Sequence, residues 1–160
     1  MTTTTHPKPG TAAEPTAAPR IVVGIDGSEA SRAALQWAAG QARLTGARLQ
    51  VVAAWQFPTY AYTALAPLPS TLDLRTTTEE TLRDVIADVL GRSADLDVTH
   101  LTKEGDPAHV LLEAAEGADL VVVGSRGHGA FAGLVLGSVS ERVAAHARCP
   151  VVVVHAPPGP

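Results

Sequence analysis

The stretch that decides the fold covers residues 118–141 and reads ADLVVVGSRGHGAFAGLVLGSVSE. It opens with a continuous apolar run at 120–123, which is typical of a short buried strand. Glycines then follow in close succession, at Gly124, Gly127, Gly129 and Gly137. A glycine-rich turn lets the backbone approach a ligand closely, and a helix that begins at Ser138 adds free N–H groups. Together these features predict a pocket that holds a phosphate chain.

Apolar runs and helical patterns alternate along the rest of the chain. Strands are predicted at residues 21–25, 49–54, 120–123 and 151–154, and a more polar strand, suited to a sheet edge, at 97–103. Helices are predicted at 30–44, at 78–91, from Asp106-Pro107 to Gly117, and at 138–147. This alternation predicts an α/β fold with a parallel five-stranded sheet and helices on both faces.

Side-chain spacing indicates which helix faces are buried. In the first helix, which Ser28 is expected to cap, the inward face is predicted to carry Ala34, Trp37, Ala38 and Gln41. The second helix is expected to start at Thr78 and to bury Leu82, Val85, Ile86, Val89 and Leu90. The last helix is expected to turn Val139, Val143, Ala144 and Ala147 inward.

Two stretches carry no periodic pattern. Residues 1–19 are rich in Thr, Pro and Ala and are expected to form a disordered tail before a single domain at 20–156, with a short tail at 157–160. Residues 55–75 contain three prolines and are expected to be an irregular loop beside the site. Tyr60 or Tyr62 could pack over a base there, although ordinary surface packing is the commoner role.

Composition narrows the function classes. The chain has 160 residues, 46% of them hydrophobic, and a net charge of −4, so no basic face is expected for nucleic acid. No apolar run approaches the roughly 18 residues of a membrane span, and no secretory signal is visible. Cys149 is the only cysteine, expected to be small and buried, and the histidines show no metal-ligand spacing. A cytoplasmic protein without an internal disulfide is predicted.

The spacing Gly124-x2-Gly127-x9-Gly137-Ser138 resembles the nucleotide-binding pattern of the universal stress protein family. IVVGIDGSEAS near the start and HARCPVVVVH near the end also resemble that family, so the similarity covers roughly residues 20–155. The resemblance implies the strand order 3-2-1-4-5 of an adenine nucleotide alpha-hydrolase-like, Rossmann-like sandwich. Ligands of such folds bind where the strand order reverses, between the strands that Asp26 and Gly124 leave.

The resemblance also implies roles for individual residues. Asp26 would lie beside the ribose, Gly24 beneath the nucleotide, and the backbone of Ala54 beside adenine. Two alternatives stay open, since Asp26 could cap its own turn and the glycines could form a tight turn without a ligand. Ser138 could be a simple N-cap, which is compatible with binding. The candidate site comprises Gly24, Asp26, Ala54, Gly124, Ser125, Arg126, Gly127, His128, Gly129, Ala130, Gly137, Ser138, Val139 and Ser140.

The predicted function is an ATP-binding, stress-response regulator that is not a fast enzyme, with Mg²⁺ held mainly by the phosphates. A homodimer through the predicted edge strand Val151–Val154 is expected, since an uncovered apolar edge favours pairing. The alternatives are a nucleotide-free dimeric interaction module and a slow ATPase. An adenylyl-transferring relative is disfavoured, because Gly27-Ser28-Glu29-Ala30 stands where such proteins carry an H-x-G-H-type signature. No catalytic constellation and no Walker lysine can be identified.

Overall fold

The computed structural model describes residues 18–56, 71–91, 95–127 and 136–156. Strands and helices alternate in these ranges, as β1 (Arg20–Gly24), α1 (Glu29–Thr45), β2 (Arg48–Trp55), α2 (Thr71–Leu90), β3 (Val98–Glu104), α3 (Pro107–Ala114), β4 (Leu120–Gly124), α4 (Ser138–His146) and β5 (Val151–Val154). The strands form one parallel sheet in the order β3-β2-β1-β4-β5. The predicted fold and strand order are confirmed.

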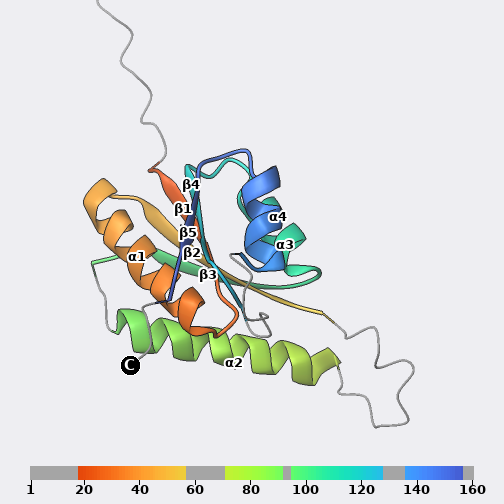
Figure 1. The fold of residues 1–160 in the computed structure, drawn as a ribbon. Coiled ribbons are helices and arrows are strands. Elements are labelled where there is room, and N and C mark those ends of the chain that lie inside the picture. The colour runs from red at the N-terminus through yellow and green to blue at the C-terminus, as the bar shows by residue number, and fades with distance from the viewer. Residues whose placement is uncertain (1–17, 57–70, 92–94, 128–135, 157–160) are drawn as a thin grey trace, which may run out of the picture.

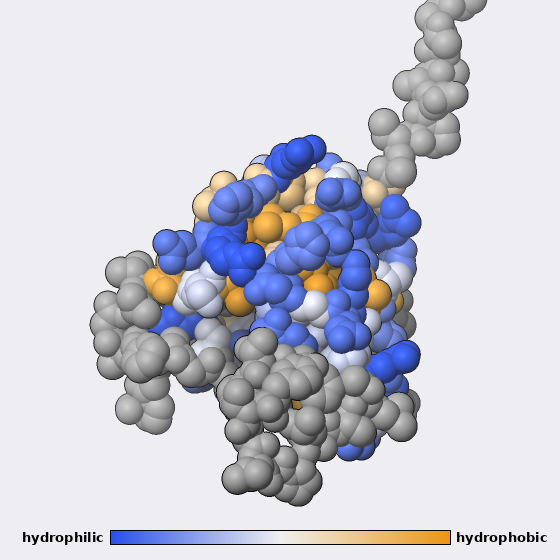
Figure 2. All heavy atoms as spheres, turned by 90° about the vertical axis from the view of Figure 1, so that its right-hand side faces the viewer, coloured by the Kyte–Doolittle hydropathy of each residue, from blue (hydrophilic) through white to orange (hydrophobic). Residues whose placement is uncertain are grey.

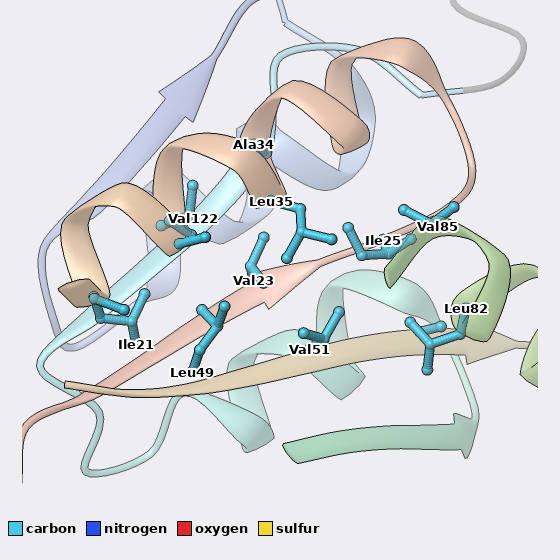
Figure 3. Close-up of a cluster of buried hydrophobic side chains, with 14 of the residues drawn as sticks. Ile21, Val23, Ile25, Ala34, Leu35, Leu49, Val51, Leu82, Val85 and Val122 are labelled. Carbon is cyan, nitrogen blue, oxygen red and sulfur yellow. The ribbon is translucent and has the colours of Figure 1, made fainter. Parts of the chain in front are cut away.

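The sheet lies between two layers of helices, with α1 and α2 on one face and α3 and α4 on the other (Figure 1). Side chains of a strand point alternately to the two faces, so β1 sends Ile21 and Val23 into the first core cluster and Val22 into the second, and Ile25, directly after the strand, joins the first. Figure 3 shows the first cluster, in which Leu35 of α1 and Leu82 of α2 face the strands. Burial on both faces explains the continuous apolar runs in the central strands.

The second cluster has a thinner cover. The side of the molecule that carries α3 and α4 is largely polar, with apolar residues visible between the polar ones near its centre (Figure 2). Helix α3 has 8 residues and α4 has 9, compared with 17 in α1. Several hydrophobic residues on this side are therefore only partly buried. Cys149 is one of them, and its partial burial raises the pKa of the thiol.

The start of α2 was wrongly predicted. The helix begins at Thr71, inside the stretch expected to be irregular, and Thr78 lies within it. The hydroxyl of Thr78 donates to the carbonyl of Leu74 at 2.8 Å, one turn earlier, instead of capping a helix start. In the first turns of α2, Asp73, Arg75, Thr76 and Thr77 are exposed. Leu72 and Leu74 are only two positions apart, so the stretch shows no apolar helical periodicity. Residues 70–90 contain no proline, however, so the backbone can continue as a helix.

Two predicted inward-facing residues are exposed. Trp37 has 40% of its surface exposed, and Ala144 also faces solvent. Helix α1 instead buries small residues and one leucine, namely Ala30, Ser31, Ala34, Leu35, Ala38, Ala39 and Ala42. Because these side chains are short, α1 lies close to the sheet and leaves no room for an indole. Helix α4 buries only Ser140 and Val143.

The end of α3 also differs from the prediction. The helix ends at Ala114 and not at Gly117. The guanidinium of Arg20 donates to the carbonyls of Ala114 and Glu116, at 2.7 and 2.5 Å. A long-range side chain thus satisfies the last carbonyls, which no local sequence pattern shows.

The chain ends and several loop residues are not among the described ranges. Predictions for residues 1–17 and 157–160, Tyr60 and Tyr62 fall there. Pro19, at the edge of the described part, offers its carbonyl to the N–H of Arg48 at 2.8 Å. Among the helices that the structure describes, none combines the length and the hydropathy of a bilayer span.

Candidate functional site

A cavity of about 520 Å³ opens at the carboxyl ends of β1, β2 and β4, beside the first residues of α1, α3 and α4. Strand β1 pairs with β2 on one side and with β4 on the other. Strands β2 and β3 lie on one side of β1, and β4 and β5 lie on the other. The strand order therefore reverses between β1 and β4, which is where open α/β sheets bind ligands. The lining residues are Gly24, Ile25, Asp26, Ser28, Ser31, Val52, Ala54, Pro107, Leu111, Val123, Gly124, Arg126, Gly127, Gly137, Ser138, Val139 and Ser140.

The turn after β1 forms one wall of the cavity. The carboxylate Oδ1 of Asp26 accepts the N–H of Ser28 at 2.9 Å. Ser28 caps α1, as predicted, and its Oγ accepts the N–H of Ser31 at 3.2 Å. Gly27, between Asp26 and Ser28, has a φ of 84°, which glycine adopts without strain. Asp26 therefore has the turn-capping geometry that was left open, and it also lines the cavity.

The glycines of the site have close neighbours within the chain itself. A Cβ at Gly24 would lie 2.8 Å from Cδ1 of Leu111. A Cβ at Gly124 would lie 2.7 Å from the carbonyl carbon of Ala30, at the start of α1. A Cβ at Gly127 would collide with Oδ2 of Asp26. At Gly124 the contact is with backbone, so internal packing favours glycine there before any ligand is considered, whereas at Gly24 and Gly127 the contact is with a side chain that would have to shift.

Ser125 joins three parts of the site from behind the cavity wall. It is 2% exposed and does not line the cavity. Its N–H donates to the carbonyl of Val154 at 2.7 Å, and its carbonyl accepts the N–H of Gly137 at 2.7 Å. The same carbonyl lies 2.9 Å from the donating hydroxyl of Ser140. These contacts fix the start of α4 against the end of β4.

The start of α4 presents backbone N–H groups to the cavity. Gly137 is the N-cap and has no side-chain capping bond, which contradicts the alternative that Ser138 is a simple N-cap. The first intrahelical bond runs from the N–H of Glu141 to the carbonyl of Gly137. The amides of Ser138, Val139 and Ser140 precede it, and all three residues line the cavity. Such amides form an anion site at the positive end of the helix dipole.

Charged groups at the rim are few. Arg126 and Asp26 are the charged side chains among the lining residues, and Arg126 is exposed. Beside the lining residue Pro107, Asp106 caps α3 by accepting the N–H of His109 at 3.0 Å. Its two carboxylate oxygens lie 2.8 and 2.9 Å from Nη1 of Arg142 on α4. The His109 amide and the Arg142 guanidinium lower the pKa of Asp106.

The structure brings together nearly all the predicted site residues that it describes. Ser125 is the exception, since it supports the wall from behind, and His128, Gly129 and Ala130 lie outside the described residues. Sequence reasoning missed Ile25, Ser28, Ser31, Val52, Pro107, Leu111 and Val123. The Asp106-Pro107 helix start was a usable signal for α3, because every helix after a parallel strand begins at the same edge of the sheet.

No group of three or more His, Cys, Asp or Glu side chains in the described ranges could hold a metal ion. The arrangement instead combines an apolar floor, from Val52, Leu111 and Val123, with amide donors at one end. Pockets of this kind suit a ligand with one flat apolar part and one anionic part.

Comparison with known proteins agrees with this geometry. A model described as the universal stress protein family matches residues 18–155. A universal stress protein of Mycolicibacterium smegmatis is 39% identical over 138 residues, which are 84% of this chain and 45% of that protein. One from Thermus aquaticus is 37% identical over 136 residues, 84% of this chain and 96% of that protein.

The chain spans about half the length of the first of these relatives. Among solved structures, a universal stress protein in complex with cAMP is 29% identical. The match has a TM-score of 0.56 and covers 89% of this chain and 100% of that one. With the family model matching nearly the whole chain, this protein belongs to the universal stress protein family.

Proposed function

We propose that the cavity binds ATP and that the protein is a nucleotide-dependent regulator of a stress response, not a fast enzyme. The observation that carries the proposal is the pairing, in one cavity, of an apolar floor with three helix-start amides. A universal stress protein 29% identical to this chain has been solved with cAMP, which supports an adenine nucleotide as the ligand class. The choice of ATP rests on the phosphate site at the start of α4.

Each part of the nucleotide has a proposed neighbour. The base would lie on Val52, Leu111 and Val123, beside the backbone of Ala54 at the end of β2. The phosphates would accept hydrogen bonds from the amides of residues 138–140. Mg²⁺ would be held mainly by phosphate oxygens, since Asp26 is the lone carboxylate among the lining residues. Four candidate glycines would shape the backbone around the ligand, namely Gly24, Gly124, Gly127 and Gly137.

We also propose that the domain at residues 20–156 forms a homodimer through β5. This strand lies at the edge of the sheet, and its four valines are all partly exposed. Val152 and Val154 flank one core cluster, and Val151 and Val153 flank the other. An apolar edge of this kind favours pairing with a second copy.

A proline at Ser138 tests the phosphate site directly. Proline is favoured at the first position of a helix, where it removes one N–H that the helix does not use. Gly137 before it is extended, with φ −79° and ψ 163°, as proline requires of its predecessor. Ser138→Pro therefore removes one amide donor while α4 stays intact. Ser138→Ala is the matched control, because it removes the hydroxyl and keeps the amide.

The expected result by isothermal titration calorimetry is a loss of roughly tenfold or more in Mg-ATP affinity for Ser138→Pro, because hydrogen bonds to charged groups contribute about 1.5–3 kcal/mol. Ser138→Ala should lose less Mg-ATP affinity than Ser138→Pro, and the affinity for adenosine should change little in either variant. Ion-exchange analysis of the purified, denatured protein should also release ATP. If no nucleotide is released and none binds at millimolar Mg-ATP, a dimeric interaction module without nucleotide takes the place of this proposal. Sustained phosphate release that disappears in Ser138→Ala would favour the slow ATPase.

A further inference from the structure

The turn after β1 and the turn after β4 meet across the cavity. The parallel register pairs Ile21 with Leu120 and Val23 with Val122. Continued beyond the paired residues, the same register brings Asp26 alongside residues 125–127. A Cβ added at Gly127 would collide with Oδ2 of Asp26, so this carboxylate oxygen fills the space of a side chain at 127.

Asp26 is exposed, yet both oxygens of its carboxylate lie beside the chain itself. Oδ1 accepts the N–H of Ser28 at 2.9 Å, which fixes the orientation of the carboxylate. Oδ2 then contacts Gly127. A second link runs parallel to this one, from the hydroxyl of Ser28 to the carbonyl of Arg126 at 3.5 Å. Two residues of the first turn therefore support two consecutive residues of the second.

This support continues to the start of α4. Gly137 lies near the same two residues, since a Cβ added at 137 would come into ordinary contact with Cα of Arg126 at 3.4 Å and with the N of Gly127 at 3.7 Å. The N–H of Gly137 also donates to the carbonyl of Ser125 at 2.7 Å. The segment at 125–127 is therefore clamped between the β1 turn on one side and the N-cap of α4 on the other. Any shift of this segment moves the amides that follow Gly137.

We propose that Asp26 is a positioning residue for the phosphate site, acting through Gly127 and Gly137, and that Asp26 and Gly127 form one steric unit. The proposal rests on the proposed ATP site and goes beyond it. A carboxylate on the ribose side of the cavity sets the geometry of amides on the phosphate side. A larger residue at 127 would displace the Asp26 carboxylate from the position in which Oδ1 accepts the N–H of Ser28.

A role as a ribose ligand makes a different prediction. If Asp26 acted only by accepting hydrogen bonds from ribose hydroxyls, its loss would weaken binding of ATP but not of 2′,3′-dideoxy-ATP, which lacks both donors. If Asp26 positions the phosphate site, its loss weakens both nucleotides by the same factor. It then also weakens ATP more than adenosine.

The test is a double-mutant cycle between Asp26→Ala and Gly127→Ala. Gly127 does not have a positive φ, so alanine is compatible with its backbone and the collision with Asp26 is the main obstacle. Two readouts are taken, namely the Kd for ATP, dideoxy-ATP and adenosine by calorimetry, and the urea midpoint of the nucleotide-free protein. Gly40→Ala and Asp84→Ala are the controls, because a Cβ at Gly40 meets nothing within 4 Å and Asp84 is an exposed carboxylate on α2.

We expect Gly127→Ala to raise the Kd for ATP about tenfold and to lower the urea midpoint. In the Asp26→Ala background, the same substitution should change both quantities little. Asp26→Ala should raise the Kd for ATP and for dideoxy-ATP by equal factors. Additive effects in the cycle, or an Asp26→Ala effect that vanishes with dideoxy-ATP, would overturn the proposal. If wild-type protein bound no ATP, the proposed function would fail, yet the urea cycle would still decide whether Asp26 and Gly127 form one unit.

Discussion

The substitution Gly124→Ala separates internal packing from ligand approach as the reason for a glycine at the end of β4. A Cβ at this position would lie 2.7 Å from the carbonyl carbon of Ala30, 2.9 Å from its Cβ and 2.9 Å from the N of Ser31. All three atoms belong to the first turn of α1 and cannot move by a side-chain rotation. Gly124 does not have a positive φ, so the substitution introduces no backbone strain of its own.

The expected loss of stability follows from these distances. Ordinary contacts begin near 3.4 Å, so α1 must move away from β4 by roughly half an ångström or more. Ala30 and Ser31 are 5% and 3% exposed, and the movement would loosen the packing of α1 on the sheet. Overpacking of a core typically costs about 1–3 kcal/mol, and we expect about 2–3 kcal/mol here. For a domain of this size, that corresponds to a melting temperature lower by about 5–10 °C.

The assay is urea unfolding of the nucleotide-free protein, followed by circular dichroism. Gly40→Ala serves as the matched control on α1, because a Cβ there meets nothing within 4 Å. It should stabilise the helix by about 0.5–1 kcal/mol, a change of opposite sign. Adding Ala30→Gly to Gly124→Ala should rescue little, since the contacts with backbone atoms remain. If Gly124→Ala unfolds within about 0.5 kcal/mol of wild type but no longer binds nucleotide, the packing argument is refuted and ligand approach becomes the reason for the glycine.

Three further predictions concern the capping, the site wall and the core. Asp106→Ala should lower stability by about 1 kcal/mol at pH 7 through loss of the N-cap. The His109 amide and the Arg142 guanidinium hold the pKa of Asp106 below its ordinary value. The difference from wild type in urea unfolding should therefore persist above the ordinary pKa of an aspartate and shrink as the pH falls through the lowered one. Ser140→Ala removes the hydroxyl that donates to the carbonyl of Ser125, and should cost about 1 kcal/mol and weaken ATP more than adenosine in calorimetry; equal weakening would contradict a phosphate-side role. Leu35→Ala, at a residue with no exposed surface, should cost about 2–5 kcal/mol without changing the m-value, and a smaller loss would show that the first core cluster collapses around the gap.

Much of the architecture could be predicted because burial leaves a direct trace in the amino-acid order. The central strands are covered on both faces and therefore consist of unbroken apolar runs, such as residues 120–123. The polarity of β3 matched its position at the sheet edge. The Asp106-Pro107 pair predicted the start of α3 correctly, since Asp106 is the N-cap and Pro107 is the first residue of the helix. The alternation indicated a site at the carboxyl ends of the strands, and the family resemblance supplied the strand order that places the ends of β1 and β4 side by side.

Local patterns failed where distant parts of the chain decide the outcome. Trp37 has the spacing of an inward residue, but the short side chains of α1 bring the helix too close to the sheet for an indole. The start of α2 carries its two leucines, Leu72 and Leu74, without helical spacing among polar residues, so its turns show no apolar periodicity. The carbonyls at the end of α3 are satisfied by Arg20, more than 90 residues away in the chain.

The sequence by itself therefore determined the α/β class, the elements and the edge of the sheet that carries the site. The tertiary structure decided why particular residues are needed there. Gly124 meets the backbone of Ala30, and Gly127 meets the carboxylate of Asp26. Each of these contacts joins segments more than 90 residues apart, and their distances depend on strand register and on how closely α1 packs. A one-dimensional pattern records which residues avoid water and which turns are tight, but it does not contain the distances between those segments.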